Sequence, residues 1–135
     1  MQEKDTGTIG ELAFSAEAMR RGYRIAQPFG DNCEYDLLLD AGQRLYRIQV
    51  KSSNCKIGAV YSFYLRRGKR KTQYTEVDIF ACYLAPERLF FLIPADAVNN
   101  RSNVKLNPQP RNTQWAPYRE NWGVFEQDYK GMMTA

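Results

Sequence analysis

The sequence contains no histidine, and this absence excludes several kinds of catalytic site at once. Histidine is the usual general base near neutral pH, the commonest zinc ligand and a member of the Ser-His and Cys-His arrangements. The cysteines Cys33, Cys55 and Cys82 are odd in number and widely spaced, which favours neither a disulfide framework nor a zinc-binding pair. Any catalysis must therefore depend on carboxylates, lysine, tyrosine or a metal ion.

Long apolar segments are also lacking. No window approaches the length of a membrane span, and the polar N-terminus has no apolar stretch behind it, so we expect no membrane partner and a cytoplasmic location. With 135 residues, 44% of them hydrophobic, the chain fits one domain with an ordinary core. The 19 Lys and Arg against 15 Asp and Glu give a net charge of +4, which would favour a polyanionic partner if the basic residues were clustered.

The spacing of apolar residues predicts one helix and a series of strands. Residues 8–22 carry apolar side chains at the interval of one helical face, and Gly22 is typical of a helix end. Residues 33–40 and 44–52 alternate around the turn pair Ala41-Gly42, which predicts a hairpin. The apolar helical face comprises Ile9, Leu12, Ala13, Ala16 and Met19; strands are further predicted at 23–27, 78–84 and 88–93, a second hairpin at 60–66 with 71–75, and a short helix near Pro94.

The C-terminal part of the chain is rich in Asn, Pro and Gln, yet it retains large aromatic side chains. These are too many for a free tail, so we expect residues 96–135 to pack on the core formed by residues 7–95. No repeat, low-complexity tract or linker divides the chain, and we predict a single domain over residues 1–135. The aromatic side chains are Trp115, Tyr118, Trp122 and Phe125.

Pairing across the first hairpin would gather polar side chains on one face. If residues 41–44 form a four-residue loop, Asp40 pairs with Leu45, and Asp36 then lies opposite Gln49. In the same register Glu34 lies opposite Lys51. A carboxylate and a carboxamide oxygen suit Mg²⁺, and a nearby lysine can orient the attacking water or offset charge on a phosphate.

The alternative interpretation of this cluster is structural. Asp36 and Lys51 could be a solvated ion pair on the polar face of a half-exposed hairpin, and periodicity alone favours that reading. Against it, Leu38 shares the supposedly polar face, and the opposite faces of both strands are apolar enough for buried strands. Glu11 has its own alternative, because Thr8 and Glu11 fit a capping box at the start of a helix.

A basic segment follows the hairpin. Clustered Arg and Lys side chains at a hairpin tip suit phosphate contacts and could enter a major groove, although a solvated turn explains them as well. Arg101, Lys105 and Arg111 could add a second basic strip. The expected DNA-binding residues are Arg66, Arg67, Lys69, Arg70 and Lys71.

Several short motifs together resemble a known enzyme family. Gly7-Thr8-Ile9-Gly10-Glu11 opens the helix, Gly22-Tyr23 follows it, Tyr35-Asp36-Leu37 lies in the first hairpin strand and Arg47-Ile48-Gln49-Val50-Lys51 in the second. This order resembles the PD-(D/E)xK nucleases, and among them the group I intron homing endonucleases. The resemblance covers at least residues 7–95 and implies a mixed α/β fold, a restriction-endonuclease-like core with a central mixed β-sheet flanked by helices.

The resemblance also implies a site and an activity. Glu11, Asp36, Gln49 and Lys51 take the catalytic positions; Asp36, Gln49 and the main-chain carbonyl of Val50 hold Mg²⁺, or Mn²⁺ as a substitute, with Glu11 as a further candidate ligand. Tyr35 stands where the family has its proline, and neutral Gln49 replaces the usual acid, which lowers the negative charge of the site and leaves Glu11 or Glu34 to supplement it. A Gln at this position resembles a minority pattern of the homing group.

The expected function is therefore site-specific hydrolysis of double-stranded DNA by a homo-oligomer, either a dimer or a tetramer, because one chain of this size reads few base pairs. The alternatives are a structure-selective nuclease of the Holliday junction resolvase or repair type, an RNA-processing nuclease, and a DNA-binding module without activity. An acid at position 49 would be typical of an archaeal resolvase, so Gln49 favours the homing type.

Overall fold

The computed structural model describes residues 2–30, 32–67, 72–99 and 101–126. Its centre is a five-stranded sheet in the order β1-β2-β3-β6-β7, formed by β1 (Arg24–Ala26), β2 (Leu37–Asp40), β3 (Leu45–Ser53), β6 (Ile79–Leu84) and β7 (Leu89–Pro94). β3 and β6 run parallel, whereas the other neighbouring strands are antiparallel. The mixed sheet and its helix are those of a restriction-endonuclease-like fold, which confirms the predicted fold class.

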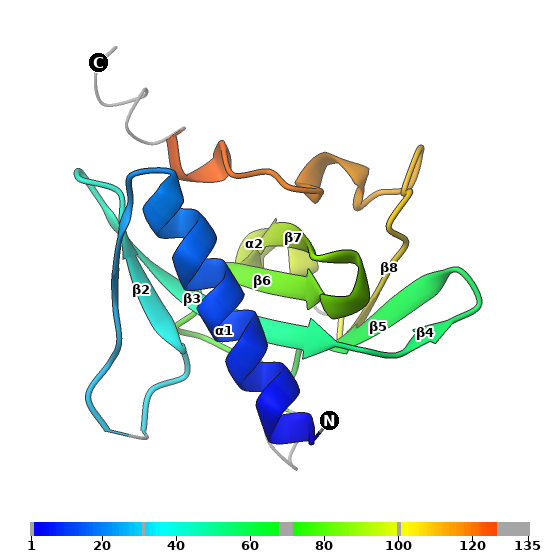
Figure 1. Cartoon of the computed structure of the whole chain (residues 1–135), viewed down its shortest axis with the longest axis horizontal. Helices are drawn as coiled ribbons and strands as arrows, with labels where there is room; N and C mark the ends of the chain where they lie inside the picture. Colours follow the sequence, from blue (N-terminus) through cyan, green and yellow to red (C-terminus); the bar gives the residue numbers. More distant parts are fainter. Residues whose placement is uncertain (1, 31, 68–71, 100, 127–135) are drawn as a thin grey trace.

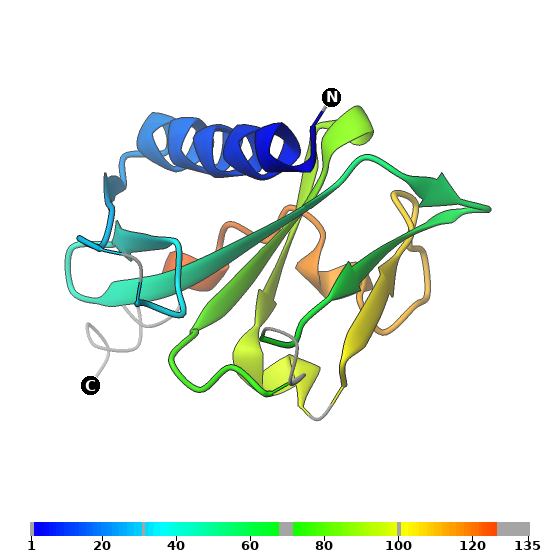
Figure 2. The same cartoon turned by 90° about the horizontal axis from the view of Figure 1, so that it is seen from below.

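Two layers cover the opposite faces of this sheet (Figures 1 and 2). The long helix α1 (Glu3–Arg20) lies over one face, mainly against β3 and β1. The other face of β6 and β7 packs against a three-stranded sheet in the order β4-β5-β8, formed by β4 (Lys56–Ile57), β5 (Val60–Tyr64) and β8 (Asn103–Leu106). The remaining elements are α2 (Ala95–Val98) and the 3₁₀ turns η1 (Ala85–Glu87) and η2 (Ala116–Tyr118).

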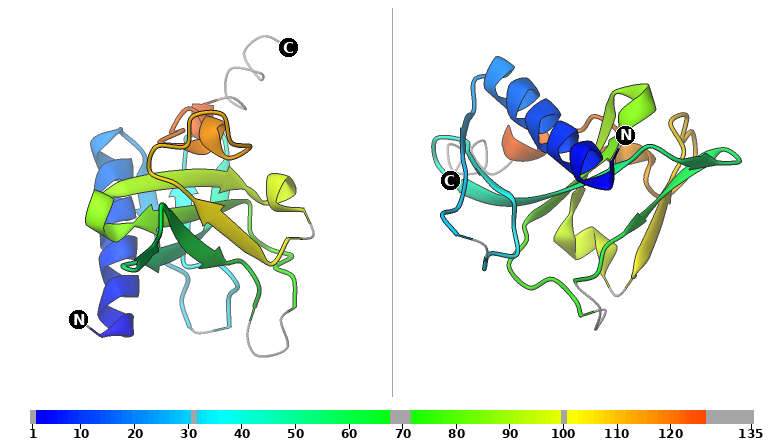
Figure 3. Two further views of the ribbon diagram at one scale, coloured as in Figure 1. Left: turned by 90° about the vertical axis from the view of Figure 1, so that its right-hand side faces the viewer. Right: turned by 60° about the horizontal axis from the view of Figure 1, so that its bottom comes forward.

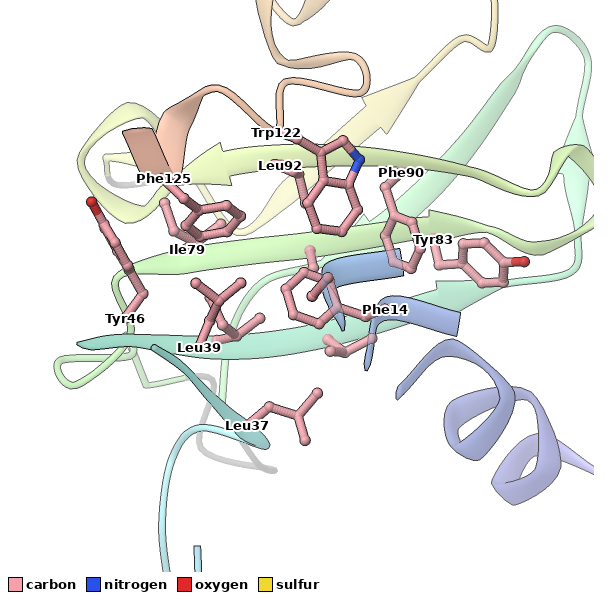
Figure 4. Close-up of a cluster of buried hydrophobic side chains, with 14 residues drawn as sticks. Phe14, Leu37, Leu39, Tyr46, Ile79, Tyr83, Phe90, Leu92, Trp122 and Phe125 are labelled. Carbon is pink, nitrogen blue, oxygen red and sulfur yellow. The ribbon is translucent and has the colours of Figure 1, made fainter. Parts of the chain in front are cut away.

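Aromatic side chains join α1 to the C-terminal segment (Figure 4). Phe14 of α1 is fully buried and stacks on Trp122, with 5.3 Å between ring centroids, while Phe90 and Phe125 meet it edge-on. Residues near the end of the described chain thereby contact a helix at its beginning, and such aromatic pairs are worth about 0.5–1.5 kcal/mol each beyond their buried area. The helix is thus anchored on the sheet by a cluster drawn from both ends of the sequence.

The first hairpin has the predicted register. Asp40 pairs with Leu45 and Leu37 with Ile48, so residues 41–44 do form a four-residue loop. Gly42 accommodates a positive φ of 94°, and its N–H donates to the Asp40 carboxylate. Leu37 and Leu39 of β2 are buried, as are Ile48 and Val50 of β3. The opposite face of β3 carries Arg47, Gln49 and Lys51.

The prediction of a second hairpin, formed by residues 60–66 and 71–75, is wrong. Residues 72–75 form no strand, and only an isolated bridge joins Arg67 to Thr72. β5 instead pairs with β8, forty residues later, with Phe63 opposite Val104. This pairing buries the apolar side chains of both strands against the central sheet, a gain that the polar segment 72–76 could not offer.

The predicted start and buried face of the helix are also wrong. α1 begins at Glu3, so Thr8 lies inside it and its hydroxyl donates to the Lys4 carbonyl; the capping box does not form. The buried face carries Gly10, Phe14 and Ala18, whereas Leu12 and Met19 of the predicted face are 65% and 63% exposed. Both faces of the helix are apolar, so spacing alone could not select the buried one. None of the helices in the described ranges is long and apolar enough to cross a membrane.

Candidate active site

Asp36 lies at the point where β2 separates from β3. Its N–H donates to the Ile48 carbonyl at 2.8 Å, and its carboxylate accepts the Val50 N–H at 2.9 Å. The β2–β3 ladder ends at Leu37 and Ile48. Beyond that point the side chain of Asp36, and not a main-chain carbonyl of β2, accepts the hydrogen bond from β3. In a β-strand the N–H and C=O of one residue point toward the same neighbour, so the Val50 carbonyl also points to the side of Asp36. The Asp36 carboxylate and the Val50 carbonyl therefore place two oxygen atoms, both suitable as metal ligands, at this edge.

Gln49 and Lys51 flank Val50 on β3, and both are half-buried. The Lys51 Nζ donates to the Tyr74 hydroxyl at 3.1 Å and lies 5.3 Å from the centre of its ring. The Gln49 carboxamide has no hydrogen-bond partner among the described residues, so its oxygen is available as a ligand. Tyr74 is a site residue that sequence reasoning missed, because the segment containing it was predicted to be a strand.

Glu11 lies on α1 and Asp36 just before β2, yet the pKa values of both carboxyl groups are raised. Burial raises the pKa of Glu11, and the neighbouring Asp36 carboxylate raises it further. Burial also raises the pKa of Asp36, against the opposing effects of the Val50 hydrogen bond and the Lys51 charge. With the capping box absent, Glu11 has a position in α1 that faces a second carboxylate. A half-buried carboxylate whose pKa is raised by a second carboxylate is part of a site that a cation would stabilise.

Glu34 is not where the extrapolated register put it. Its carboxylate accepts hydrogen bonds from the N–H groups of Thr75 and Glu76, from the Thr75 hydroxyl and from Arg67. Burial raises the pKa of Glu34, but these bonds outweigh burial and hold it below its ordinary value. The expectation that Glu34 faces Lys51 and could supplement the metal site is therefore wrong, since its oxygens are occupied by Arg67 and by the two residues that follow Tyr74.

The predicted DNA-binding segment is only partly described. Arg66 is half-buried, and Arg67 is 50% exposed while its guanidinium binds Glu34. Lys69, Arg70 and Lys71 lie outside the described residues. Asp36 lines an open cleft of about 300 Å³ together with residues of the β1–β2 connection.

The donor set fits a hard divalent cation. In the described part of the chain no three His, Cys, Asp or Glu side chains cluster, so a structural zinc site is not indicated there. Two carboxylates, a carboxamide oxygen and a main-chain carbonyl are instead the oxygen ligands that Mg²⁺ takes, with water completing its coordination. Glu11, Asp36, Gln49 and the Val50 carbonyl are the residues that could hold it.

The raised pKa values predict an unusual effect of Asp36→Asn on stability. A carboxyl with a folded-state pKa above its unfolded value contributes stability that is complete below the unfolded pKa and is lost as the pH rises through the folded pKa. The carboxamide oxygen introduced by the substitution could still accept the Val50 N–H. In EDTA we therefore expect the variant to melt at a higher temperature than the unsubstituted protein at pH 8, with the difference disappearing near pH 3.

Adding Mg²⁺ at pH 8 should reverse this order, because only the protein with Asp36 gains stability from binding the cation. Thermal unfolding followed by circular dichroism measures both effects. Asp40→Asn, in the hairpin turn, is the matched control and should not alter the response to Mg²⁺. An Asp36→Asn variant that melts below the unsubstituted protein in EDTA at pH 8 would contradict the electrostatic account of the site.

The fold, together with oxygen atoms beside a lysine at the edge of β3, has the features expected of a metal-assisted nuclease. A sequence profile of the PD-(D/E)XK endonuclease family matches residues 1–125, and the chain belongs to this family of phosphodiester hydrolases. The family typically uses a divalent metal ion and acts on DNA. The departures are Tyr35 in place of the proline and Gln49 in place of the acid.

Solved structures similar to this chain include those of two nucleases. One is a bacterial homing endonuclease, I-Ssp6803I, with a TM-score of 0.82, 25% sequence identity and 99% coverage of both chains. The other is a Holliday junction resolvase, Hjc, from the archaeon Archaeoglobus fulgidus, with a TM-score of 0.60, 18% identity and coverage of 89% of this chain and 95% of that one. The second likeness concerns the fold alone. No curated protein sequence matches the chain.

Proposed function

We propose that this endonuclease cuts duplex DNA at specific sites with Mg²⁺, as a homo-oligomer. The observation that carries the proposal is the edge of β3, where Asp36 binds the Val50 N–H beside Gln49 and Lys51. The similarity to a homing endonuclease over the full length of both chains supports this substrate class. Gln49, which would be an acid in an archaeal resolvase, supports it against the junction-specific alternative.

Each residue has a chemical task in this proposal. Asp36, Gln49, the Val50 carbonyl and Glu11 hold the Mg²⁺. When bound there, Mg²⁺ lowers the pKa of a water molecule and offsets charge on the scissile phosphate.

Lys51 supplies a positive charge at the same place. Its hydrogen bond to Tyr74 fixes the side chain at the site, so the ammonium group can orient the attacking water and stabilise charge that develops on the phosphate oxygens. Tyr74 therefore acts through Lys51 as a positioning residue. The basic residues Arg66, Arg67, Lys69, Arg70 and Lys71 contact the DNA backbone in this proposal, and salt should weaken binding accordingly.

The test offers three substrates to one preparation in Mg²⁺: a supercoiled plasmid library with randomised inserts, a four-way DNA junction and a structured RNA. Sequencing of the cut ends should give a small set of recurring sites in duplex DNA, and the junction should be cut no faster than its separate arms. Symmetric resolution of the junction with intact plasmid would overturn the proposal in favour of a resolvase. Cleavage of RNA alone would indicate an RNA-processing nuclease.

Gln49→Glu tests whether position 49 binds the metal. A carboxylate there adds a negative charge to the ligand set, so we expect Mg²⁺ or Mn²⁺ to bind on the order of tenfold more tightly, as ~1.4 kcal/mol of additional attraction would give. The same change should lower the melting temperature in EDTA, because three carboxylates then repel one another.

Isothermal titration with Mn²⁺ measures the affinity of Gln49→Glu. Gln43→Glu, exposed in the hairpin turn, adds the same charge away from the site and should leave the affinity unchanged. Equal effects of the two substitutions would mean that overall charge, and not a ligand at position 49, changes metal binding.

A further inference from the structure

The outer face of α1 is apolar and faces solvent. Leu12 and Met19 are 65% and 63% exposed, Ile9 is 39% exposed, and Ala16 is exposed as well. These residues recur at intervals of three and four, which is the spacing of the contact positions in a pair of packed helices. They lie opposite the buried face of Phe14 and Ala18, so the helix has two apolar faces and the fold uses only one of them.

No described segment covers this outer face. α1 lies at the surface of the molecule in both views of Figure 3, and its packing partners β1 and β3 are on its inner side. A contiguous stripe of exposed apolar side chains is typical of a protein–protein interaction surface.

We propose that this face is where two copies of the chain associate, with their α1 helices packed antiparallel about a two-fold axis near the level of Phe14. In this arrangement Ile9 of each copy meets Met19 of the other, and Leu12 meets Ala16. Ile9 thus lies against the flexible side chain of Met19, and Leu12 against the small side chain of Ala16. Close helix packing requires such complementary sizes. A two-fold contact also lets one surface bind itself and close.

Charge complementarity selects the antiparallel arrangement. Asp5 lies at the beginning of the apolar stripe and Arg20 at its end, with Arg24 soon after the helix. Antiparallel packing brings Asp5 of one copy within about one helical turn of Arg20 of the other, which also pairs with Glu17 of its own helix, and it opposes the two helix dipoles. Parallel packing would place Arg20 against Arg20 and leave a gap where Ala16 meets Ala16.

This inference deepens the proposed function and rests on it, because it names the surface through which the cutting homo-oligomer forms. Its first test is sedimentation velocity of the full chain. We expect the unsubstituted protein to associate, and Leu12→Glu and Met19→Glu to weaken that association at least about 100-fold in Kd, since each two-fold contact would bury the new charge twice. If the assembly is a tetramer, these variants should reduce it to dimers.

Leu45→Glu and Ile57→Glu are the matched controls, because they place the same charge on exposed apolar residues, 58% and 72% exposed, outside α1. They should leave association unchanged. A monomeric unsubstituted protein at about 100 µM, or equal association of the α1 variants and the unsubstituted chain, would overturn the proposal. Selective association of the α1 face with a different protein, with no self-association, would overturn it too.

Cysteine cross-linking tests the direction of packing and does not depend on a charged variant that folds. Cys33→Ser and Cys55→Ser first remove the exposed thiols. A mixture of Leu12→Cys and Ala16→Cys proteins should then form a disulfide between the two variants, because these positions face each other across an antiparallel pair. Linkage of each variant only to itself would indicate parallel packing, and no linkage at all would contradict the contact.

Cleavage distinguishes failure of this inference from failure of the proposed function. Dissociated α1 variants should still nick one strand of a plasmid in Mg²⁺ while losing paired cuts, since each copy keeps its own site. Association without any cleavage would leave the α1 contact standing and overturn the proposed nuclease specificity instead.

Discussion

Replacing Asp36 or Lys51 by alanine should lower the rate of Mg²⁺-dependent DNA cleavage by about a thousandfold while DNA binding survives. Asp36→Ala removes the carboxylate that binds the Val50 N–H and offers an oxygen to the cation. Lys51→Ala removes the charge that lies beside Asp36 and is held by Tyr74. Plasmid nicking measures the rate, and DNA affinity is measured separately in Ca²⁺.

Two matched substitutions distinguish a local effect from a general one. Asp96→Ala in the first turn of α2 and Lys56→Ala on β4 remove the same side-chain types from exposed positions, and both should cut at the ordinary rate. Unchanged cleavage by Asp36→Ala and Lys51→Ala would contradict the assignment of the site. Lost binding together with lost cleavage would instead assign these residues to DNA recognition.

Gly10→Ala should destabilise the protein by roughly 1–3 kcal/mol, although alanine ordinarily favours a helix. A Cβ at Gly10 would overlap the Ser52 Oγ and lie 3.3 Å from the Ser52 Cβ. The glycine therefore permits the close approach of α1 to β3 that places Glu11 beside Asp36. Moving the helix outward should reduce metal affinity as well as the free energy of unfolding, and urea unfolding and Mn²⁺ titration measure the two effects.

A double-mutant cycle with Ser52→Ala tests this explanation. The Ser52 hydroxyl is buried without a hydrogen-bond partner among the described residues, so its removal alone should cost little. In the Ser52→Ala background Gly10→Ala should cost much less than in the unsubstituted protein, because the overlapping Oγ is gone and only the contacts with the Cβ of residue 52 and the Val50 Cγ1 remain. Gly7→Ala is the control on the same helix, where a Cβ meets nothing within 4 Å and should stabilise by up to about 1 kcal/mol. Equal effects at positions 7 and 10 would contradict the proposed clash.

The lowered pKa of Asp78 reflects stabilising contacts, whereas the raised pKa values of Glu11 and Asp36 reflect burial, which destabilises the charged form. Asp78 accepts the Arg47 N–H and a paired guanidinium contact; burial raises its pKa, but these bonds outweigh burial and hold it below the ordinary value. Its bonds join the start of β3 to the start of β6, and their contribution to stability is lost as the pH falls through the depressed pKa. Glu11 and Asp36 have raised pKa values instead and weaken the metal-free fold at neutral pH, which is typical of a site built to bind a cation.

The first hairpin and its register could be predicted from the sequence alone. Strand side chains alternate with period two, and a four-residue loop fixes which residues pair, so the pairing of Leu37 with Ile48 and of Asp40 with Leu45 followed from short-range geometry. The absence of histidine and the run of motifs from Gly7 to Lys51 indicated the family. Both kinds of information are local or depend only on residue order.

The surroundings of this hairpin became visible only in three dimensions. The buried face of α1, the pairing of β5 with β8, the diversion of Glu34 to Thr75 and the contact of Tyr74 with Lys51 all join segments distant in sequence. Such contacts depend on which surfaces bury the most apolar area together, and no periodicity within one segment encodes that choice. The helix shows this most directly, because both of its faces carry apolar side chains and the sheet buries only one of them.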